Sequence, residues 1–263
     1  MELGGKVFVV TGGGNGMGRQ VALGLLARGA RVAAVDLDEK GLAETARLSA
    51  AAPDRLTVHT TNIADREAVQ ALADDVVGTH EHVDGVANIA GIIHRFARFS
   101  ELTVEEAERI MDVNFWGTVH MCRTFLPLLK ERPTASLVNM SSLAALIPFA
   151  SQTIYGASKG AVKQFSEGLH AELLGTGVTV TTIFPGNIST NLTGNSGVKM
   201  IDAGGRKVRS TTPEEAGRTI VAGIEKGSFR VLVGSDARLL DRLVRLNARW
   251  ATRLIARQMN SVL

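Results

Sequence analysis

The chain contains 263 residues, of which 45% are apolar, and this length favours one α/β domain with a large core over two domains. Its net charge of +3 is uneven, because the segment from Asp236 to Leu263 holds six arginines and two aspartates and the rest is slightly acidic. This distribution argues against a nucleic-acid enzyme with a basic working face. With neither an apolar run near the ~20 residues of a membrane span nor a signal-peptide pattern, a cytoplasmic protein is expected.

Short apolar or β-branched runs alternate with helical patterns along the chain. The runs predict strands at 6–10, 31–35, 56–60, 85–89, 136–140, 178–183 and 229–233. The helical patterns lie near 16–29, 39–50, 66–80, 103–131, 154–175, 213–227 and 237–258. Most strands are apolar on both faces, which is typical of a parallel sheet covered by helices on each side. We therefore predict one α/β domain over residues 1–263, a doubly wound, mostly parallel, seven-stranded sheet of the Rossmann type.

A glycine-rich turn follows the first predicted strand. Gly12, Gly16 and Gly18 are spaced G-x-x-x-G-x-G between an apolar strand and an amphipathic helix. Glycines here allow a tight turn and let the backbone approach a pyrophosphate, which the helix N-terminus attracts. Such a turn alone is a weak signal, because glycine also ends strands for structural reasons. Its place inside the first strand–helix–strand unit is what indicates a dinucleotide site.

Asp36 ends the second predicted strand, eighteen residues after Gly18. This spacing is close to the ~20 residues expected for an acid that binds the adenosine ribose. The carboxylate would repel a 2′-phosphate, and neither Asn15 nor Leu37 supplies a positive charge. We therefore expect NAD(H) in preference to NADP(H). The alternative role, capping the next helix, suits Asp38 better.

Tyr155 is the only tyrosine and lies four residues before Lys159 in a helical pattern, so the two share one helix face. A nearby ammonium favours the phenolate, so we expect the pKa of Tyr155 to fall below its usual value of about 10. Such a phenol could serve as a general acid or base. Ser142, just after a strand, could hydrogen-bond the substrate oxygen, with Ser141 as the second candidate. The alternatives are a solvated helix face for the pair and ordinary loop hydrogen bonding for the serines.

Six motifs follow one another in a recognisable order. They are T-G-x-x-x-G-x-G (Thr11–Gly18), N-x-A-G (Asn88–Gly91), the asparagine of MDVNFWG (Asn114), the serine of NMSS (Ser142), Y-x-x-x-K (Tyr155–Lys159) and FPGNIST (Phe184–Thr190). Over about residues 4–190 the chain resembles the short-chain dehydrogenase/reductase family. The resemblance implies a single-domain oxidoreductase that assembles as a homodimer or homotetramer.

The resemblance also implies roles for individual positions. The catalytic residues would be Asn114, Ser142, Tyr155 and Lys159, with Tyr155 as the general acid/base and Asn114 holding a water in a proton relay. Contacts to NAD would come from Gly12, Asn15, Gly16, Met17, Gly18, Asp36, Leu37, Asn62, Ile63, Asn88, Ala90, Gly91, Tyr155, Lys159, Pro185, Gly186, Ile188 and Thr190. Two positions depart from the family pattern: Asn62 stands where many members have Asp, and Ile89 replaces a frequent second Asn.

The substrate pocket is expected between the loop after the fourth strand, the segment after Ser142, and the aperiodic 187–212 loop. Its candidate contacts are His94, Ser142, Phe149, Tyr155 and Leu192. Because the surrounding residues are mostly apolar, we expect a hydrophobic secondary alcohol or ketone, such as a lipid, steroid or terpenoid. Basic residues at 206, 207 and 209 leave an anionic or thioester substrate open. The alternative functions are a non-catalytic dinucleotide-binding or sensing protein and an NADP-linked acyl thioester ketoreductase.

The C-terminal extension, 237–263, has the pattern of one basic amphipathic helix, in which Asn247 interrupts the apolar stripe. We expect it to pack on its own domain or on a neighbouring subunit, which is commoner than binding an anionic membrane. The six histidines show no compelling metal-ligand spacing, so no metal is expected, and His80 and His82 are expected to face water.

Overall fold

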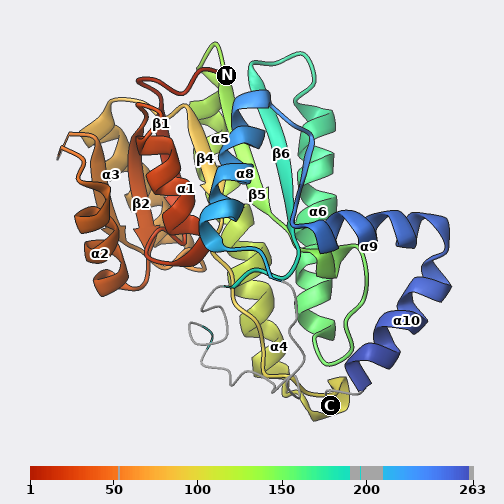
Figure 1. The fold of residues 1–263 in the computed structure, drawn as a ribbon. Coiled ribbons are helices and arrows are strands. Elements are labelled where there is room, and N and C mark those ends of the chain that lie inside the picture. Colours follow the sequence, from red (N-terminus) through yellow and green to blue (C-terminus); the bar gives the residue numbers. More distant parts are fainter. Residues whose placement is uncertain (53, 190–195, 197–209, 261–263) are drawn as a thin grey trace.

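Parallel strands form one sheet in the order β3-β2-β1-β4-β5-β6-β7 in this computed structural model, which describes residues 1–52, 54–189, 196 and 210–260 (Figure 1). The strands are β1 (Val7–Thr11), β2 (Arg31–Asp36), β3 (Leu56–Thr60), β4 (Gly85–Asn88), β5 (Ala135–Met140), β6 (Val178–Pro185) and β7 (Arg230–Val233). The predicted doubly wound, seven-stranded sheet is therefore confirmed. The strand order reverses between β1 and β4, and doubly wound sheets bind ligands outside the carboxyl ends of the strands at such a point.

Helices cover both faces of the sheet (Figure 1). One layer consists of α1 (Gly16–Leu26), α2 (Glu39–Ser49) and α8 (Pro213–Lys226), and the other of α3 (Arg66–His80), α5 (Gly117–Lys130) and α6 (Thr153–Glu172). Side chains that accept the first free N–H groups fix where several helices begin. Asp65 accepts from Glu67 N at 2.9 Å before α3, and Thr212 accepts from Glu215 N at 3.2 Å before α8.

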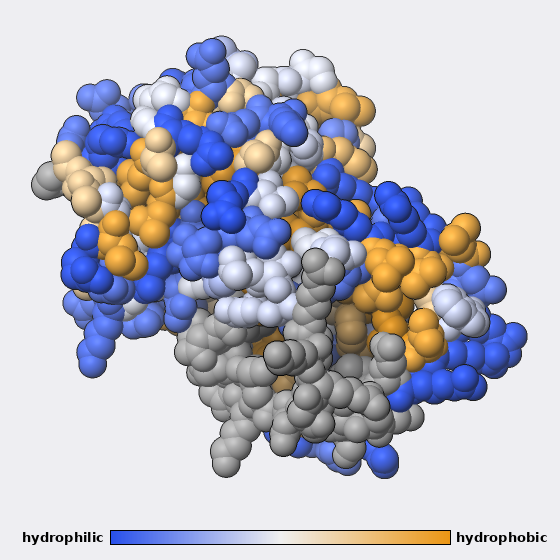
Figure 2. Space-filling model, viewed as in Figure 1, coloured by the Kyte–Doolittle hydropathy of each residue, from blue (hydrophilic) through white to orange (hydrophobic). Residues whose placement is uncertain are grey.

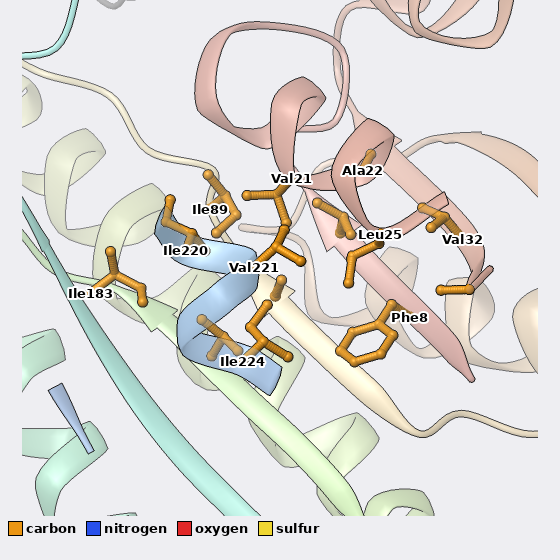
Figure 3. Packing of buried hydrophobic residues seen from close by; sticks show 14 of the residues in the cluster. Phe8, Val21, Ala22, Leu25, Val32, Ile89, Ile183, Ile220, Val221 and Ile224 are labelled. Atoms are coloured by element: carbon orange, nitrogen blue, oxygen red, sulfur yellow. The ribbon is translucent and has the colours of Figure 1, made fainter. Parts of the chain in front are cut away.

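Alternate residues of the inner strands supply two separate cores, because side chains alternate between the faces of a sheet. Phe8 and Val32 pack against Leu25 of α1 and Val221 and Ile224 of α8 (Figure 3). The neighbouring positions, such as 9 and 35, face the other layer, where Cys122 is buried as expected of a small core residue. Full burial of each large apolar side chain contributes about 1.5–3 kcal/mol.

The predicted helix over 103–131 is interrupted by one wide turn. α4 (Val104–Met111) passes into a π-helical turn, η2 (Asp112–Trp116), before α5 begins. A π-helical turn adds one residue to a helix and occurs often at functional sites. Here it contains Asn114, whose side chain is fully buried. Hydrophobic periodicity could not show this turn, because it shifts the apolar pattern by only one position.

The C-terminal extension forms two helices, α9 (Ser235–Leu246) and α10 (Ala248–Asn260), and not the single helix predicted. Asn247 separates them, and its Oδ1 accepts from Trp250 N at 2.9 Å at the start of α10. Both helices pack on this chain through a buried cluster made of Leu143, Ile147, Ala237, Ala251 and Ile255. The extension therefore packs on its own domain, which is one of the two favoured arrangements.

The outer side of the extension keeps apolar side chains among basic ones (Figure 2). Leu239, Leu246 and Trp250 are exposed there, together with the six arginines of the extension. Across the part of the chain that the structure describes, no helix combines the length and the apolar character needed to cross a bilayer.

A buried carboxylate lies at the amino edge of the sheet. Asp84, just before β4, accepts from Val7 N at 3.0 Å, from Lys6 Nζ at 3.2 Å and from Arg132 Nε at 2.9 Å. Burial raises the pKa of Asp84, but the hydrogen bonds from Val7, Arg132 and Lys6 outweigh it and leave the pKa below its usual value. The starts of β1, β4 and β5 are thus joined through one side chain.

The two neighbouring histidines differ from the expectation. His80 is buried, and its Nε2 lies 2.9 Å from the hydroxyl of Thr57 on β3. Burial lowers the pKa of His80 to about 4. The prediction that it faces water is wrong, because the last turn of α3 lies against the sheet. His82 is half-buried, with its Nε2 3.2 Å from Asp84.

Candidate active site

A cleft of about 770 Å³ opens at the carboxyl edge of the sheet, between the turns that follow β1, β2, β3 and β4. The predicted cofactor residues found in its lining are Gly12, Asn15, Gly16, Met17, Gly18, Asp36, Leu37, Asn62, Ile63, Ala90 and Gly91. Since α1 begins at Gly16, the free N–H groups of its first turn lie at this wall, where they favour an anion.

The glycine-rich turn depends on two of its glycines. Gly12 has a φ of 71°, in the left-handed region that favours glycine. A Cβ on Gly18 would lie 2.1 Å from the carbonyl oxygen of Gly12, so no larger residue fits. Asn15 completes the turn, because its side chain accepts from Gly16 N at 2.6 Å. Because no side chain stands at Gly12 or Gly18, the turn stays compact and neither position fills the cleft beside it.

Asp36 lies in the cleft with both carboxylate oxygens engaged by backbone. One oxygen accepts from Gly14 N at 2.9 Å and the other from Asp38 N at 3.1 Å. Asp38 holds the capping position of α2, although its side chain makes no cap hydrogen bond within the described residues. Sequence reasoning passed over Arg19, whose guanidinium donates to the carbonyls of Gly14 and Gly41. A cation thus lies near Asp36, held by backbone oxygens.

The turn after β4 is held by hydrogen bonds to the end of the neighbouring strand, β1. The hydroxyl of Thr11 accepts from Ile89 N at 3.0 Å and from Ala90 N at 3.2 Å. Asn88 was predicted to contact the cofactor, but its buried side chain donates to Asn139 Oδ1 at 2.8 Å and is absent from the described cleft lining. Asn88 therefore joins β4 to β5 beneath the cleft. Polar residues inside otherwise apolar strands were the available signal for Thr11 and Asn139.

Ser142 and Tyr155 meet at the end of β5. Ser142 lies close enough to Tyr155 to lower the pKa of the phenol, and Ser142 Oγ accepts from Ala144 N at 3.0 Å. Ser141, the second candidate, instead donates to the carbonyl oxygen of Lys159 at 2.8 Å. It therefore ties the end of β5 to α6 and leaves Ser142 as the serine beside the phenol.

Lys159 and Asn114 flank Gly91 at the mouth of the cleft. A Cβ on Gly91 would lie 3.0 Å from Lys159 Nζ and 3.1 Å from Asn114 Oδ1. Lys159 is only 3% exposed, and its Nζ donates to the carbonyl oxygen of Met140 at 3.0 Å. Asn114 is held by Ile92 N, which donates to its Oδ1 at 2.8 Å. The π-helical turn η2 thus delivers Asn114 to the same place as Lys159.

Burial shifts the two titratable groups in opposite directions. It raises the pKa of Tyr155 above its usual value, an effect that the nearby Ser142 side chain partly opposes. It lowers the pKa of Lys159 to about 8. The predicted fall in the pKa of Tyr155 is therefore wrong in this structure. The reason is that removal from water disfavours the charged form of both groups.

The turn after β6 provides the remaining predicted cofactor residues. Pro185 ends the strand, Gly186 N donates to the carbonyl oxygen of Val233 at 2.9 Å, and Ile188 forms a β-bridge with Thr211. Thr190 and Leu192 lie outside the described residues, as does most of the predicted 187–212 loop.

The other two predicted substrate residues are held by their neighbours. His94 is buried; its Nδ1 lies 2.7 Å from the carbonyl oxygen of Arg95, and its own carbonyl oxygen accepts from Gln152 at 2.8 Å. Phe149 packs with the cluster beneath the C-terminal helices. That segment is the one that follows Ser142, so the extension forms the outer support of the expected substrate wall.

Comparison with known proteins gives concordant matches. A family model described as short chain dehydrogenase matches residues 6–200. SadH of Mycobacterium tuberculosis, which carries the name of an oxidoreductase, is 38% identical over 261 residues, covering 96% of this chain and 94% of SadH. Among solved structures, a short chain dehydrogenase/reductase from Burkholderia phymatum in complex with NAD superposes with a TM-score of 0.85 at 25% identity, covering 95% of this chain and 96% of the other. A short chain dehydrogenase from Burkholderia cenocepacia in complex with NADP gives 0.81 at 27% identity, covering 97% and 99%.

Proposed function

The chain belongs to the short chain dehydrogenase/reductase family, and from this premise we propose that it is an NAD(H)-dependent oxidoreductase that interconverts a secondary alcohol and a ketone. The observation that carries the proposal is that Ser142 lies beside Tyr155 at the end of β5, while Lys159 and Asn114 flank Gly91 at the mouth of the cleft. A protein that only binds or senses dinucleotides has no need for a serine and a phenol side by side at that place.

The shape of the cleft fits a dinucleotide. The turn after β1 has no room for a side chain at Gly18, and the start of α1 offers free N–H groups to a pyrophosphate. Asp36 would hold the adenosine ribose, and the turn from Pro185 to Thr190 would hold the carboxamide of the nicotinamide. When bound, the nicotinamide supplies the hydride acceptor or donor.

Tyr155 handles the proton in this proposal. With its pKa raised, the phenol is protonated at neutral pH and can donate to a carbonyl oxygen during reduction. The Ser142 hydroxyl donates to the same oxygen as its negative charge develops. Lys159, with a pKa of about 8, can take up or release a proton near neutral pH, and Asn114 would hold the water that continues the relay.

Asp36 is the basis for proposing NAD and not NADP. One structurally similar protein is in complex with NAD and another with NADP, so the similarity does not distinguish the two cofactors. We therefore base the cofactor preference on the charge at the end of β2. The fixed carboxylate would repel a 2′-phosphate, while the guanidinium of Arg19 is already held by backbone oxygens.

The test measures kcat/KM with NAD and with NADP, using a panel of apolar secondary alcohols. The wild-type protein is expected to prefer NAD by at least about tenfold, since one like-charge contact costs on the order of 1.4 kcal/mol. Asp36→Ala should lose most of that preference, while Asp74→Asn on the exposed side of α3 should keep it. If no substrate is turned over with either NAD or NADP, the proposed reaction is contradicted. If the protein prefers NADP, only the proposed cofactor preference is contradicted.

An apolar substrate and a homo-oligomer complete the proposal. Leu143 and Ala144 follow Ser142 and are buried, which supports a hydrophobic substrate wall. A groove of about 550 Å³ between α4 and α6 is lined by Phe99, Val104 and Trp116, whose exposed apolar surface supports pairing of two chains there. Sedimentation equilibrium should show a dimer or tetramer, and a monomer at micromolar concentration would contradict this assembly.

A further inference from the structure

Asp236 connects the C-terminal extension to the turn after β6. It is the second residue of α9, and its Oδ2 accepts a hydrogen bond from Asn187 N at 2.6 Å. The two residues are 49 positions apart in sequence. Figure 1 shows α9 starting beside the end of β6, at the carboxyl edge of the sheet.

Two glycines leave space for this carboxylate. A Cβ on Gly186 would lie 2.3 Å from both oxygens of Asp236, and a Cβ on Gly234 would lie 2.5 Å from Oδ1. Gly234 also has a φ of 100°, which other residues rarely adopt. Distances this short exclude any side chain at either position while Asp236 stays where it is. The carboxylate is therefore fitted into the turn and does not merely lie near it.

A carboxylate at the start of a helix can also serve the helix alone, through the dipole, with a gain of about 0.3–1 kcal/mol. The contacts favour a different role. Among the described residues, the start of α9 shows no hydrogen bond from a side-chain cap. Asp236 Oδ2 accepts a hydrogen bond from the backbone N–H of Asn187 in the turn after β6. The carbonyl oxygen of Asn187 in turn accepts from Thr211 N at 2.9 Å.

We propose that Asp236 is a positioning residue for the nicotinamide end of the cofactor. By holding Asn187, it fixes the backbone that follows Pro185 at the carboxyl end of β6, next to the strand that ends at Ser142. Ligands of doubly wound sheets bind outside these strand ends. The inference rests on the proposed function, and it makes the C-terminal extension part of the cofactor site.

The experiment compares two ligands. NADH contains the nicotinamide, and ADP-ribose lacks it but shares the adenosine and the pyrophosphate. Dissociation constants for both are measured with the wild-type protein, with Asp236→Ala and Asp236→Asn, and with the control Asp241→Asn. Asp241 lies on the same helix and pairs with the exposed Arg245. Melting temperatures and kcat are recorded for each protein.

Asp236→Ala is expected to weaken NADH binding by about tenfold, the loss of one hydrogen bond to a charged group, and to leave ADP-ribose binding within twofold of wild type. Asp236→Asn keeps an acceptor and should show a smaller loss, and Asp241→Asn should show none. Unchanged NADH binding in Asp236→Ala, or equal losses for NADH and ADP-ribose, would overturn the inference.

A second variant covers the case in which Asp236→Ala does not fold. Gly186→Ala adds a methyl group where the carboxylate lies, so it should displace Asp236 and give the same loss of NADH with ADP-ribose retained. Equal affinity of Gly186→Ala and wild type for NADH would also contradict the inference. Failure of the proposed function has a different signature, because the wild-type protein would then either bind neither ligand or bind both without turning over any alcohol or ketone.

Discussion

Single residues at the carboxyl edge show how burial sets the chemistry. Tyr155 and Lys159 are both withdrawn from water, which raises one pKa and lowers the other to about 8. A protonated phenol is a proton donor at neutral pH, which under the proposed function suits the reduction of a ketone. Oxidation of an alcohol needs the phenolate, and its rate should therefore rise with pH until the phenol has titrated.

Replacing Tyr155 by Phe tests this proton transfer. We expect kcat to fall by about 10²–10⁴-fold, the usual range for loss of a general acid or base, with NADH binding little changed. Because Tyr155 is the only tyrosine, the ultraviolet absorbance of phenolate reports this one group. In the wild-type protein without cofactor it should titrate above the usual pKa of a phenol, because burial raises the pKa of Tyr155. Titration well below that value would show that the Lys159 ammonium lowers the pKa of Tyr155 by more than burial raises it.

Residue identities at this site were predictable, but their environments were not. Spacing indicated Ser142, which follows a strand end, and Tyr155 and Lys159, which lie one helix turn apart, whereas Asn114 came from the resemblance to the family. The direction of the Tyr155 shift depends on how much of the chain covers the phenol, and no local pattern records that. The hydrogen bond that Asn88 makes to Asn139 was not predictable for a similar reason, since the two residues lie 51 positions apart.

At the scale of elements, the strands and most helices follow from apolar runs and caps, while interruptions within helices do not. The wide turn at Asp112–Trp116 and the break at Asn247 both lie inside patterns that read as continuous helices. Each interruption changes what the helix can reach. The first brings Asn114 to Lys159, and the second lets α10 pack against the segment that follows Ser142.

Ile255 of α10 allows a test of that second arrangement. It is buried in the cluster with Leu143 and Ile147, so Ile255→Ala leaves a cavity there. Burial loss of this kind costs about 2–4 kcal/mol, and at a chain end it should appear as local opening of α9 and α10. We expect faster amide exchange over 235–257 and a higher KM for apolar substrates. Leu239→Ala, at an exposed position on α9, is the matched control and should change neither measurement.

The whole molecule separates two tasks between the edges of one sheet. The amino edge carries Asp84, which joins the starts of three strands, and the carboxyl edge carries the cleft and the hydroxyl groups of Ser142 and Tyr155. Sequence periodicity predicted the sheet but not this carboxylate, because its partners Lys6 and Arg132 come from distant segments. Net charge and composition do not indicate which charged residues pair, so they could not predict the contact of Asp84 with Lys6 and Arg132.

Asp84→Asn should destabilise the folded protein by about 2–4 kcal/mol at pH 7, because Lys6 and Arg132 lose their buried counter-charge. The folded pKa of Asp84 is below its unfolded value of about 3.9, so its contribution is present above that pH and is lost as the pH falls through the folded pKa. Urea unfolding should therefore show a large gap between the variant and wild type at pH 7 and a smaller gap below pH 4. A gap that does not change with pH would contradict this account, and Asp241→Asn should show almost none.

The distance between those two edges has an evolutionary consequence. β1 runs for five residues from beside Lys6 to Thr11, roughly 16 Å at the usual rise per residue. Adaptation to heat often sacrifices turnover, because the residues that are rigidified are also the ones that must move. In this chain, selection could strengthen the anchor at one end of β1 and leave the reacting groups at the other end untouched. Its relatives from warm habitats would then be expected to differ at the amino edge first.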